Sequence, residues 1–352
     1  MKGTGLMRSQ WVRSAAIVAA IAFSVAACGA GASPDAAPTA SVTPTCDYSP
    51  ITGTCFDPEA PVLVVKIDDV SEARPQFHLN QADIVLVEPV EGGLTRLFVA
   101  YNSTLPETVG PIRSARITDT DLVPIFGNPL FAYSGSQSKL VPFLKEAPMQ
   151  MVGAPQGGTG YSRLTDRPAP HNYVANVQEL LTRVDDPVTA KLSASSYWKI
   201  AAKGIVEGTA IGKALVHWPA ADKTFIWDKA AKNWAIDVYT KKLMTQIDAA
   251  GTVERARATN VVIMESQLQD SDFGDKFGAR TPYPQTLGTG NGMVLIDGKA
   301  ITATWKRDAA TDLPHWYAQD GSELALRPGN TWWLIVSDLE TVKLSPLVTP
   351  AA

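Results

Sequence analysis

The sequence predicts an α+β fold, with a mixed α/β domain over residues 60–200 and a mostly β domain over residues 201–345. In the first segment, short apolar runs alternate with stretches of helical character, as in folds where strands and helices interleave. In the second segment, short apolar runs are separated by turn residues, which is typical of an all-β region. The length of 352 residues suits two domains beyond a leader and a tether.

The first 28 residues have the features of an exported lipoprotein. Residues 1–27 show the layout of a signal peptide, in which basic residues precede a short apolar stretch and two alanines. Cys28 follows these alanines and resembles the lipid-bearing cysteine of a bacterial lipobox. An ordinary secretory signal followed by a chance cysteine is the alternative. We expect a secreted, extracytoplasmic chain that lipid on Cys28 holds to the cell membrane.

Residues 28–59 are expected to form a flexible tether. Gly29 to Thr45 contains almost only Ala, Pro, Ser, Thr and Gly, a composition that cannot bury a core. Cys46 and Cys55 follow, and two spare cysteines this close in an exported protein predict a disulfide. A metal pair is the alternative, although no histidine lies near them. We interpret the pair as a clip on the tether, whose reduction leaves the main domains folded.

Apolar runs bounded by polar or turn residues predict the strands of the first domain. The first predicted helix is short and ends at Gly127-Asn128-Pro129. The predicted strands cover 61–68, 83–88, 95–101, 108–112 and 130–133, and the predicted helices cover 119–126, a segment ending at 146, and 176–184.

Turn signals organise the second domain. Asp297-Gly298, between two apolar runs, is a strong hairpin signal. Residues 288–292 are rich in glycine and are expected to form a loop. Tryptophans belong more often to the core than to a surface on which sugars stack. We therefore expect the tryptophans in or near the predicted strands to be buried. The predicted strands cover 224–227, 233–236, 259–264, 293–296, 300–305 and 332–336, and the tryptophans are Trp305, Trp316, Trp332 and Trp333.

The charge of the chain argues against nucleic-acid binding. The net charge is −4, and removing residues 1–27 takes away Lys2, Arg8 and Arg13 and no acid, which leaves about −7. No long basic run remains to neutralise a phosphate backbone. We therefore expect no nucleic-acid partner.

The densest group of charged residues lies at strand ends of the first domain. Asp68 ends one predicted strand, Glu91 precedes another, and Arg96 lies near the start of that strand. Arg113 and Arg116 follow the next strand. Ligand sites of α/β folds lie at strand ends, and guanidinium groups suit phosphate or carboxylate. Structural ion pairs are the alternative, and spacing alone favours them.

Two further residues are candidates for the same site. His171 and Asn172 follow Pro170 in a loop, where His171 is either a ligand-binding residue or a hydrogen-bonded anchor. No cofactor is evident from the sequence. Asp68 is the candidate ligand if the site holds a metal, and Mg²⁺ would be needed only for phosphate chemistry.

Residues 60–337 resemble the YerB-like lipoproteins, a family built from the N- and C-terminal domains of unknown function 3048. The resemblance implies a lipid-anchored protein of two family domains and no particular reaction. Asp69 stands where the family pattern has Asn, which leaves a metal role for the Asp68-Asp69 pair in doubt. The matching motifs are Lys66 to Asp69, Ala73 to Gln76, Gln81 to Val85, Val90 to Arg96, Gly110 to Arg116, Pro170 to Tyr173, Asn260 to Val262, Gly288 to Gly292 and Pro328 to Trp332.

Three hypotheses for function follow. The first is an uncharacterised cell-envelope lipoprotein that binds an anionic cell-wall precursor or envelope polymer through the arginine and acid cluster. The second is an enzyme that transfers a phosphoryl or glycosyl-phosphate group from a lipid-pyrophosphate precursor, because the arginine layout is similar to that of the LytR-CpsA-Psr phosphotransferases. The third is a scaffold for envelope proteins, in which the cluster is structural. Whether the chain is an enzyme is left open by the sequence.

Overall fold

The computed structural model describes residues 46–187, 197–204, 207–239, 242–275 and 277–347. The predicted signal peptide, Cys28 and the tether up to residue 45 lie outside the described residues. Residues 45–352 form one compact unit. No helix in the described part of the chain is both long and apolar enough to cross a membrane.

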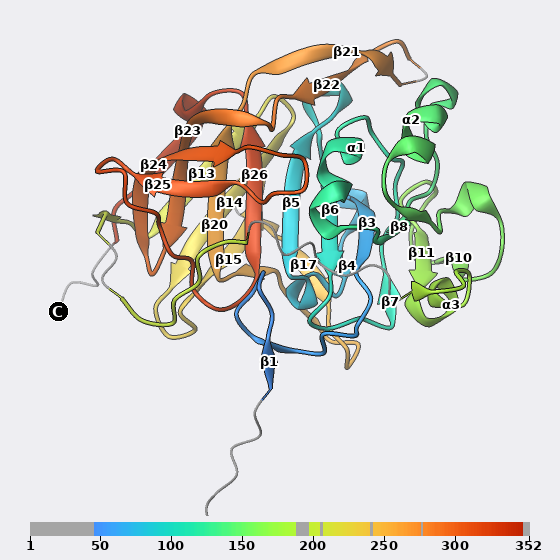
Figure 1. Ribbon diagram of the computed structural model, residues 1–352, viewed down its shortest axis with the longest axis horizontal. Helices are drawn as coiled ribbons and strands as arrows, with labels where there is room; N and C mark the ends of the chain where they lie inside the picture. Colours follow the sequence, from blue (N-terminus) through green and yellow to red (C-terminus); the bar gives the residue numbers. More distant parts are fainter. Residues whose placement is uncertain (1–45, 188–196, 205–206, 240–241, 276, 348–352) are drawn as a thin grey trace, which may run out of the picture. The chain divides into compact units, whose positions relative to one another are not determined.

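A mixed eleven-stranded sheet forms the centre of this unit (Figure 1). Its middle strands are antiparallel on one side, where β3 and β5 flank β6, and parallel where β26 joins β5 to β20. The order across the sheet is β12 (Thr209–Ala210), β24 (Lys299–Arg307), β23 (Gly288–Ile296), β20 (Asn260–Glu265), β26 (Thr331–Val336), β5 (Ile84–Pro89), β6 (Thr95–Tyr101), β3 (Leu63–Asp68), β8 (Leu130–Ala132) and β9 (Gln150–Met151), with β25 (His315–Ala318) on β24.

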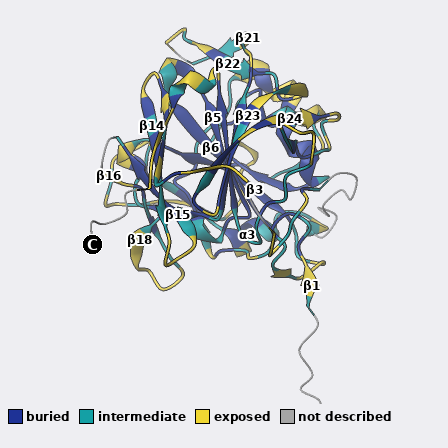
Figure 2. Cartoon of the chain, turned by 90° about the vertical axis from the view of Figure 1, so that its left-hand side faces the viewer, coloured by how far each residue is buried: buried dark blue, intermediate teal, exposed yellow. Residues whose placement is uncertain are grey.

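Both faces of this sheet are covered, which explains why its strands read as continuous apolar runs rather than alternating ones. Alternate residues of β3 belong to two separate cores: Val65 lies on one face and Val64 on the other. In Figure 2 the strands at the centre are accordingly buried along their length.

A second, six-stranded sheet covers the face of the central sheet that carries Val65. Phe225 of this sheet meets Trp332 of the central sheet edge-on, with ring centroids 6.2 Å apart, in one shared core. Its strands are β13 (Lys213–Trp218), β14 (Ala221–Asp228), β15 (Asn233–Val238), β16 (Lys242–Leu243), β19 (Arg257–Ala258) and β27 (Val342–Ser345).

Short helices and loops cover the other face. The helices there are α1 (Asp119–Leu122), continued by a 3-10 turn to Phe126, and α2 (Val141–Glu146). Four small sheets complete the fold. They contain β1 (Asp47–Tyr48) with β2 (Cys55–Phe56), β4 (Gln76–Phe77) with β17 (Thr245–Ile247) and β18 (Val253–Arg255), β7 (Thr108–Val109) with β11 (Tyr173–Asn176) and β10 (Tyr161–Arg163), and β21 (Leu268–Gly274) with β22 (Arg280–Pro284).

The predicted α+β class is corrected to a mostly β fold. Helices occur where they are expected in the first segment, but α1, α2 and α3 (Val177–Leu181) contain only four, six and five residues. Pro124 and Gly127 limit the first, since proline cannot donate the backbone hydrogen bond of a helix interior, whereas Pro142 lies in the first turn of α2, where proline is tolerated. The strands of both segments therefore dominate the fold.

The central sheet contains strands from both predicted domains. β26 of the second segment lies between β5 of the first and β20 of the second, and β4 of the first pairs with β17 of the second. The central sheet therefore contains strands from both sides of residue 200. The domain boundary at this residue stays a prediction.

The expected loop at residues 288–292 is wrong, because these residues form the first half of β23. Its glycines make room for neighbouring indoles rather than for a turn. A Cβ on Gly290 would lie 2.7 Å from Trp305, and one on Gly292 would lie 2.5 Å from Trp316. The predicted hairpin at Asp297-Gly298 is confirmed, with positive φ at both residues.

The predicted disulfide between Cys46 and Cys55 is present. The residues that it encloses belong to the folded body: Ile51 is buried, and the carbonyl of Thr52 accepts a hydrogen bond from Gly329. The four tryptophans expected in the core, Trp305, Trp316, Trp332 and Trp333, are all buried.

Candidate functional site

A row of charged residues lies across the ends of three neighbouring strands of the central sheet. In the strand register, Arg96 of β6 lies opposite Asp68 of β3 and opposite Glu88 of β5. Residues directly opposite one another share a face, so the three side chains lie on the face covered by α1 and α2. Lys66, two residues before Asp68 on β3, lies on the same face.

Lys66 is the centre of a fully buried ion cluster. Its ammonium group pairs with Glu88 and lies 2.7 Å from Oδ1 of Asp119, and all three side chains are 0% exposed. Burial raises the pKa of Glu88 to about 7, and the charge of Asp119 adds to the effect while Lys66 opposes it. Asp119 also accepts a hydrogen bond from the backbone N–H of Arg116, at 2.7 Å, which joins this cluster to the arginine loop.

Arg96 is buried without an acidic partner. The residue is 6% exposed, and among the described residues no carboxylate lies within ion-pair distance of its guanidinium group. Among the described residues, Nε of Arg96 has no hydrogen-bond partner. Nη1 of Arg96 donates a long hydrogen bond of 3.4 Å to the carbonyl of Ser114. Burial, followed by the charges of Arg116 and Arg113, lowers the pKa of Arg96 to about 10.

The loop that carries the other two arginines is fixed against the end of β3. Arg113 donates its backbone N–H to the carbonyl of Lys66, at 2.8 Å, and Asp68 donates to the carbonyl of Pro111, also at 2.8 Å. On its other side the loop bonds to residues 134 and 135. The backbone therefore presents Arg113 and Arg116 on a rigid support beside Arg96.

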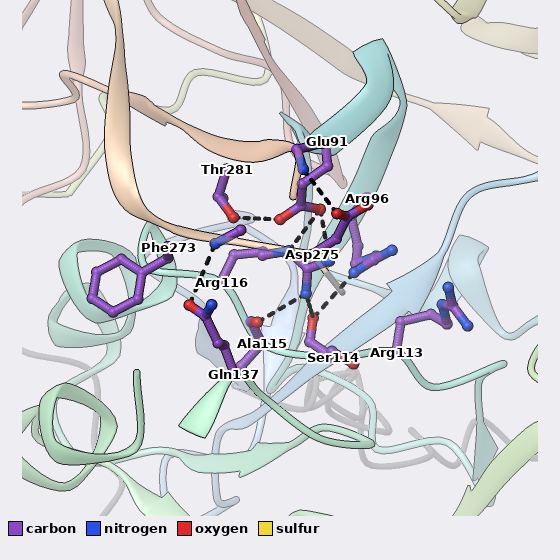
Figure 3. A network of polar contacts seen from close by, with 12 residues as sticks. Glu91, Arg96, Arg113, Ser114, Ala115, Arg116, Gln137, Phe273, Asp275 and Thr281 are labelled. Atoms are coloured by element: carbon purple, nitrogen blue, oxygen red, sulfur yellow. Dashed lines mark hydrogen bonds and ion pairs between the residues drawn. The ribbon is translucent and has the colours of Figure 1, made fainter. Parts of the chain in front are cut away.

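Arg113 and Arg116 differ from Arg96 in having acidic partners. Nε of Arg113 lies 3.3 Å from Asp68, and Nη2 and Nε of Arg116 donate to Glu91, at 2.7 and 3.0 Å. Glu91 also accepts a hydrogen bond from Thr281 (Figure 3). Although burial opposes ionisation, the hydrogen bonds and the charge of Arg116 hold the pKa of Glu91 below its usual value.

The three arginines line one cavity of about 660 Å³. The loop at 113–117 and the residues around Glu91 form two walls, and the β21–β22 hairpin forms another. Asp275 of this hairpin also lines the cavity, but its carboxylate accepts from the backbone N–H groups of residues 277 and 279 of its own turn. The cavity thus holds three guanidinium groups, and Glu91 is the acid that pairs with one of them.

Asp68 and His171 lie behind Arg113. Nδ1 of His171 is 2.8 Å from Oδ2 of Asp68, the same oxygen that faces Arg113. Asn172 has a different role: it accepts from Arg163 and donates to the carbonyl of Leu164, each at 2.8 Å, and so holds its own loop. Within the described ranges, no group of three or more His, Cys, Asp or Glu side chains could hold a metal ion.

The structure thus brings six of the seven predicted ligand-binding residues into one charged network. Arg96, Arg113, Arg116 and Glu91 line the cavity, whereas Asp68 and His171 support Arg113 from behind. Sequence reasoning missed Lys66 and Asp119, because the two acids that pair with Lys66 lie 22 and 53 residues away from it in the sequence. It also missed the β21–β22 hairpin, whose short strands lack a strong apolar pattern.

A second buried ion cluster lies on the opposite face of the sheet. Asp69 faces Lys223 of β14 at 2.5 Å and Arg74 at 3.2 Å, and it accepts from Thr95 at 2.5 Å. Burial favours the neutral acid, but Lys223 and Arg74 outweigh it and lower the pKa of Asp69. Burial also lowers the pKa of Lys223. Every charge here has a partner, so this cluster joins the two sheets and offers no free cation to a ligand.

Comparisons with known proteins agree with this architecture. The family models described as the N-terminal and C-terminal domains of the protein of unknown function DUF3048 match residues 51–189 and 214–333. The chain is 27% identical over 298 residues to a Bacillus subtilis (strain 168) protein named "Putative lipoprotein YerB", which covers 81% of this chain and 83% of that protein.

The fold has also been seen in a solved structure. The crystal structure of the YerB protein from Bacillus subtilis matches with a TM-score of 0.69 at 23% identity, over 85% of this chain and 99% of that one. This likeness concerns the fold alone. Family membership rests on the two family models, which match both halves of the chain. The chain therefore belongs to the DUF3048 family, through both its N-terminal and its C-terminal domain.

Proposed function

We propose that this protein is a membrane-attached lipoprotein whose arginine-lined cavity binds a phosphate-bearing ligand of the cell envelope. The observation that carries the proposal is Arg96, a buried guanidinium group with no carboxylate partner among the described residues. An unpaired buried charge is costly, and groups whose pKa is shifted by burial cluster at functional sites. The name of the Bacillus relative supports the lipid anchor.

A phosphate suits this cavity better than a carboxylate does. Three guanidinium groups line the cavity, and their forked donors match the several oxygens of a phosphate or pyrophosphate. Arg96 would supply the buried contact, while Arg113 and Arg116 would approach from the loop. Because Glu91 pairs with Arg116 and Asp68 pairs with Arg113, the ligand would chiefly neutralise Arg96.

The test is a thermal shift of residues 45–352, which form one compact unit, with inorganic phosphate and pyrophosphate. Pyrophosphate at 100 times its dissociation constant should stabilise the protein by about 2.7 kcal/mol. Arg113→Gln should abolish most of that shift, because its side chain is 23% exposed and lines the cavity. Arg280→Gln is the matched control, since Arg280 is an exposed arginine of the adjacent hairpin that does not line the cavity.

Equal shifts in both variants would mean that the anion binds elsewhere. The absence of a shift with either anion would sink the proposal and favour the scaffold hypothesis, in which the cluster serves stability alone.

One observation favours transferase activity as a second candidate. The His171–Asp68 pair resembles the base and orienting acid of many catalytic sites, and it lies directly behind Arg113. In that case a magnesium ion held with the bound phosphate would assist the reaction. The test is turnover of a lipid-pyrophosphate substrate. Turnover that is lost in His171→Gln while phosphate binding is retained would establish this activity. Binding without turnover would mean that the lipoprotein is a receptor.

A further inference from the structure

Apolar side chains gather at the rim of the arginine-lined cavity. Phe273 of β21 packs edge-on against Phe143 of α2, with ring centroids 5.4 Å apart. Phe143 is 47% exposed, its neighbour Val141 is 37% exposed, and Phe277 at the tip of the hairpin is 82% exposed. Burying such side chains is normally favourable, so their exposure beside a ligand cavity points to an apolar group of the ligand.

The cavity changes in character from its charged end toward this rim. Arg96 is buried at the charged end, and the apolar side chains of Leu94, Ile117 and Leu140 also line the cavity. Phe273 and Phe277 line it as well. Figure 3 shows Phe273 and Gln137 on the side of the network away from Arg113, where Gln137 accepts a long hydrogen bond of 3.3 Å from Gly274 of the hairpin. A bare phosphate would leave all of this apolar surface in water.

We propose that the ligand is a lipid phosphate, whose head group binds at Arg96 and Arg113 and whose hydrocarbon chain lies against Phe143, Phe273 and Phe277. This inference rests on the proposed function and names the class of ligand. Charge complementarity assigns the head group, since the unpaired guanidinium is cationic. The hydrocarbon is assigned by the aromatic rim, which provides dispersion contacts and no hydrogen bonds beyond the backbone.

The experiment compares dodecyl phosphate, below its critical micelle concentration, with inorganic phosphate by isothermal titration calorimetry on residues 45–352. The alkyl chain should tighten binding at least tenfold, because its burial against the rim is favourable. The double variant Phe143→Ser/Phe277→Ser should lose most of this gain and keep its affinity for inorganic phosphate. Leu243→Ser/Val253→Ser is the matched control, since both residues are exposed apolar residues that do not line the cavity.

Each outcome separates this inference from the proposed function. Phosphate binding that needs Arg113 but gains nothing from the alkyl chain would overturn the lipid phosphate and leave the anion site intact. Failure of both ligands to bind would remove the proposed function as well. Vesicles of anionic phospholipid provide the third arm: binding to vesicles that depends on Phe277 but not on Arg113 would make the rim a membrane contact and overturn the proposal.

Discussion

At the scale of single residues, the chemistry of the site follows from which charges have partners. Lys66 pairs with both Glu88 and Asp119 in a dry environment, and Arg116 pairs with Glu91. Arg96 is flanked by strand partners of opposite charge, Asp68 and Glu88, but each of these carboxylates is engaged by another cation. The result is a buried guanidinium group with no carboxylate within ion-pair distance among the described residues, and we propose that a ligand neutralises it.

Glu88 should make the stability of the protein depend on pH. Its pKa is about 7 in the folded state and 4.5 in the unfolded chain, so the folded state holds the extra proton between these values. The free energy of unfolding should therefore fall as pH rises from 4.5 to 7, and the loss should persist above 7. Glu88→Gln should flatten this part of the profile, measured by urea unfolding from pH 4.5 to 8.

Glu340→Gln is the control for this measurement, because Glu340 is an exposed residue near the end of the chain. A Glu88→Gln profile that runs parallel to that of the unmodified protein would contradict the raised pKa.

At the scale of elements, the two sheets are held together by charge as well as by the apolar core. Asp69, just after β3, meets Lys223 of β14, and both side chains are almost fully buried. Lys223→Met should lower the free energy of unfolding by about 3–5 kcal/mol, because it leaves a buried carboxylate with one cation fewer. Lys223→Met combined with Asp69→Leu should cost less than the sum of the two single changes, as measured by a double-mutant cycle in urea.

An exposed ion pair gives the comparison for this cycle. Lys306 and Asp308 are 54% and 67% exposed, so Lys306→Met should cost no more than about 1 kcal/mol. Additive effects of the changes at Asp69 and Lys223 would show that the two side chains do not interact across the sheets.

The elements also show what can be predicted from sequence. The strands β3, β5, β6, β20 and β26 stand out because they are apolar along their whole length, and the Asp297-Gly298 turn stands out because it needs positive φ twice. Gly290 and Gly292 led to the wrong prediction of a loop. Each glycine lies in a strand and leaves room for an indole ring, of Trp305 or of Trp316, that is distant in the sequence. The arginine cluster was predictable from strand ends, whereas the supporting pair Lys66 and Asp119 and the β21–β22 hairpin depend on tertiary contacts that no local pattern encodes.

At the scale of the whole molecule, the shared sheet predicts that neither half folds alone. A fragment ending at residue 200 would lack β26, so β5 would expose an apolar edge that β26 covers in the intact chain. We expect residues 45–200 and 201–352, produced separately, to lack fixed tertiary structure by near-ultraviolet circular dichroism, and to regain it when mixed. A cooperative thermal transition in either isolated fragment would show that the predicted boundary at residue 200 separates independent domains.

The most direct test of the central claim is a crystal structure of residues 45–352 grown with pyrophosphate. We expect the anion in the arginine-lined cavity, within hydrogen-bond distance of the Arg96 guanidinium group and of Arg113. Lys203, Lys229, Lys232 and Arg327 line a different cavity, near Trp227. Pyrophosphate bound there, with the site at Arg96 empty, would contradict the claim that the unpaired guanidinium group is the ligand site.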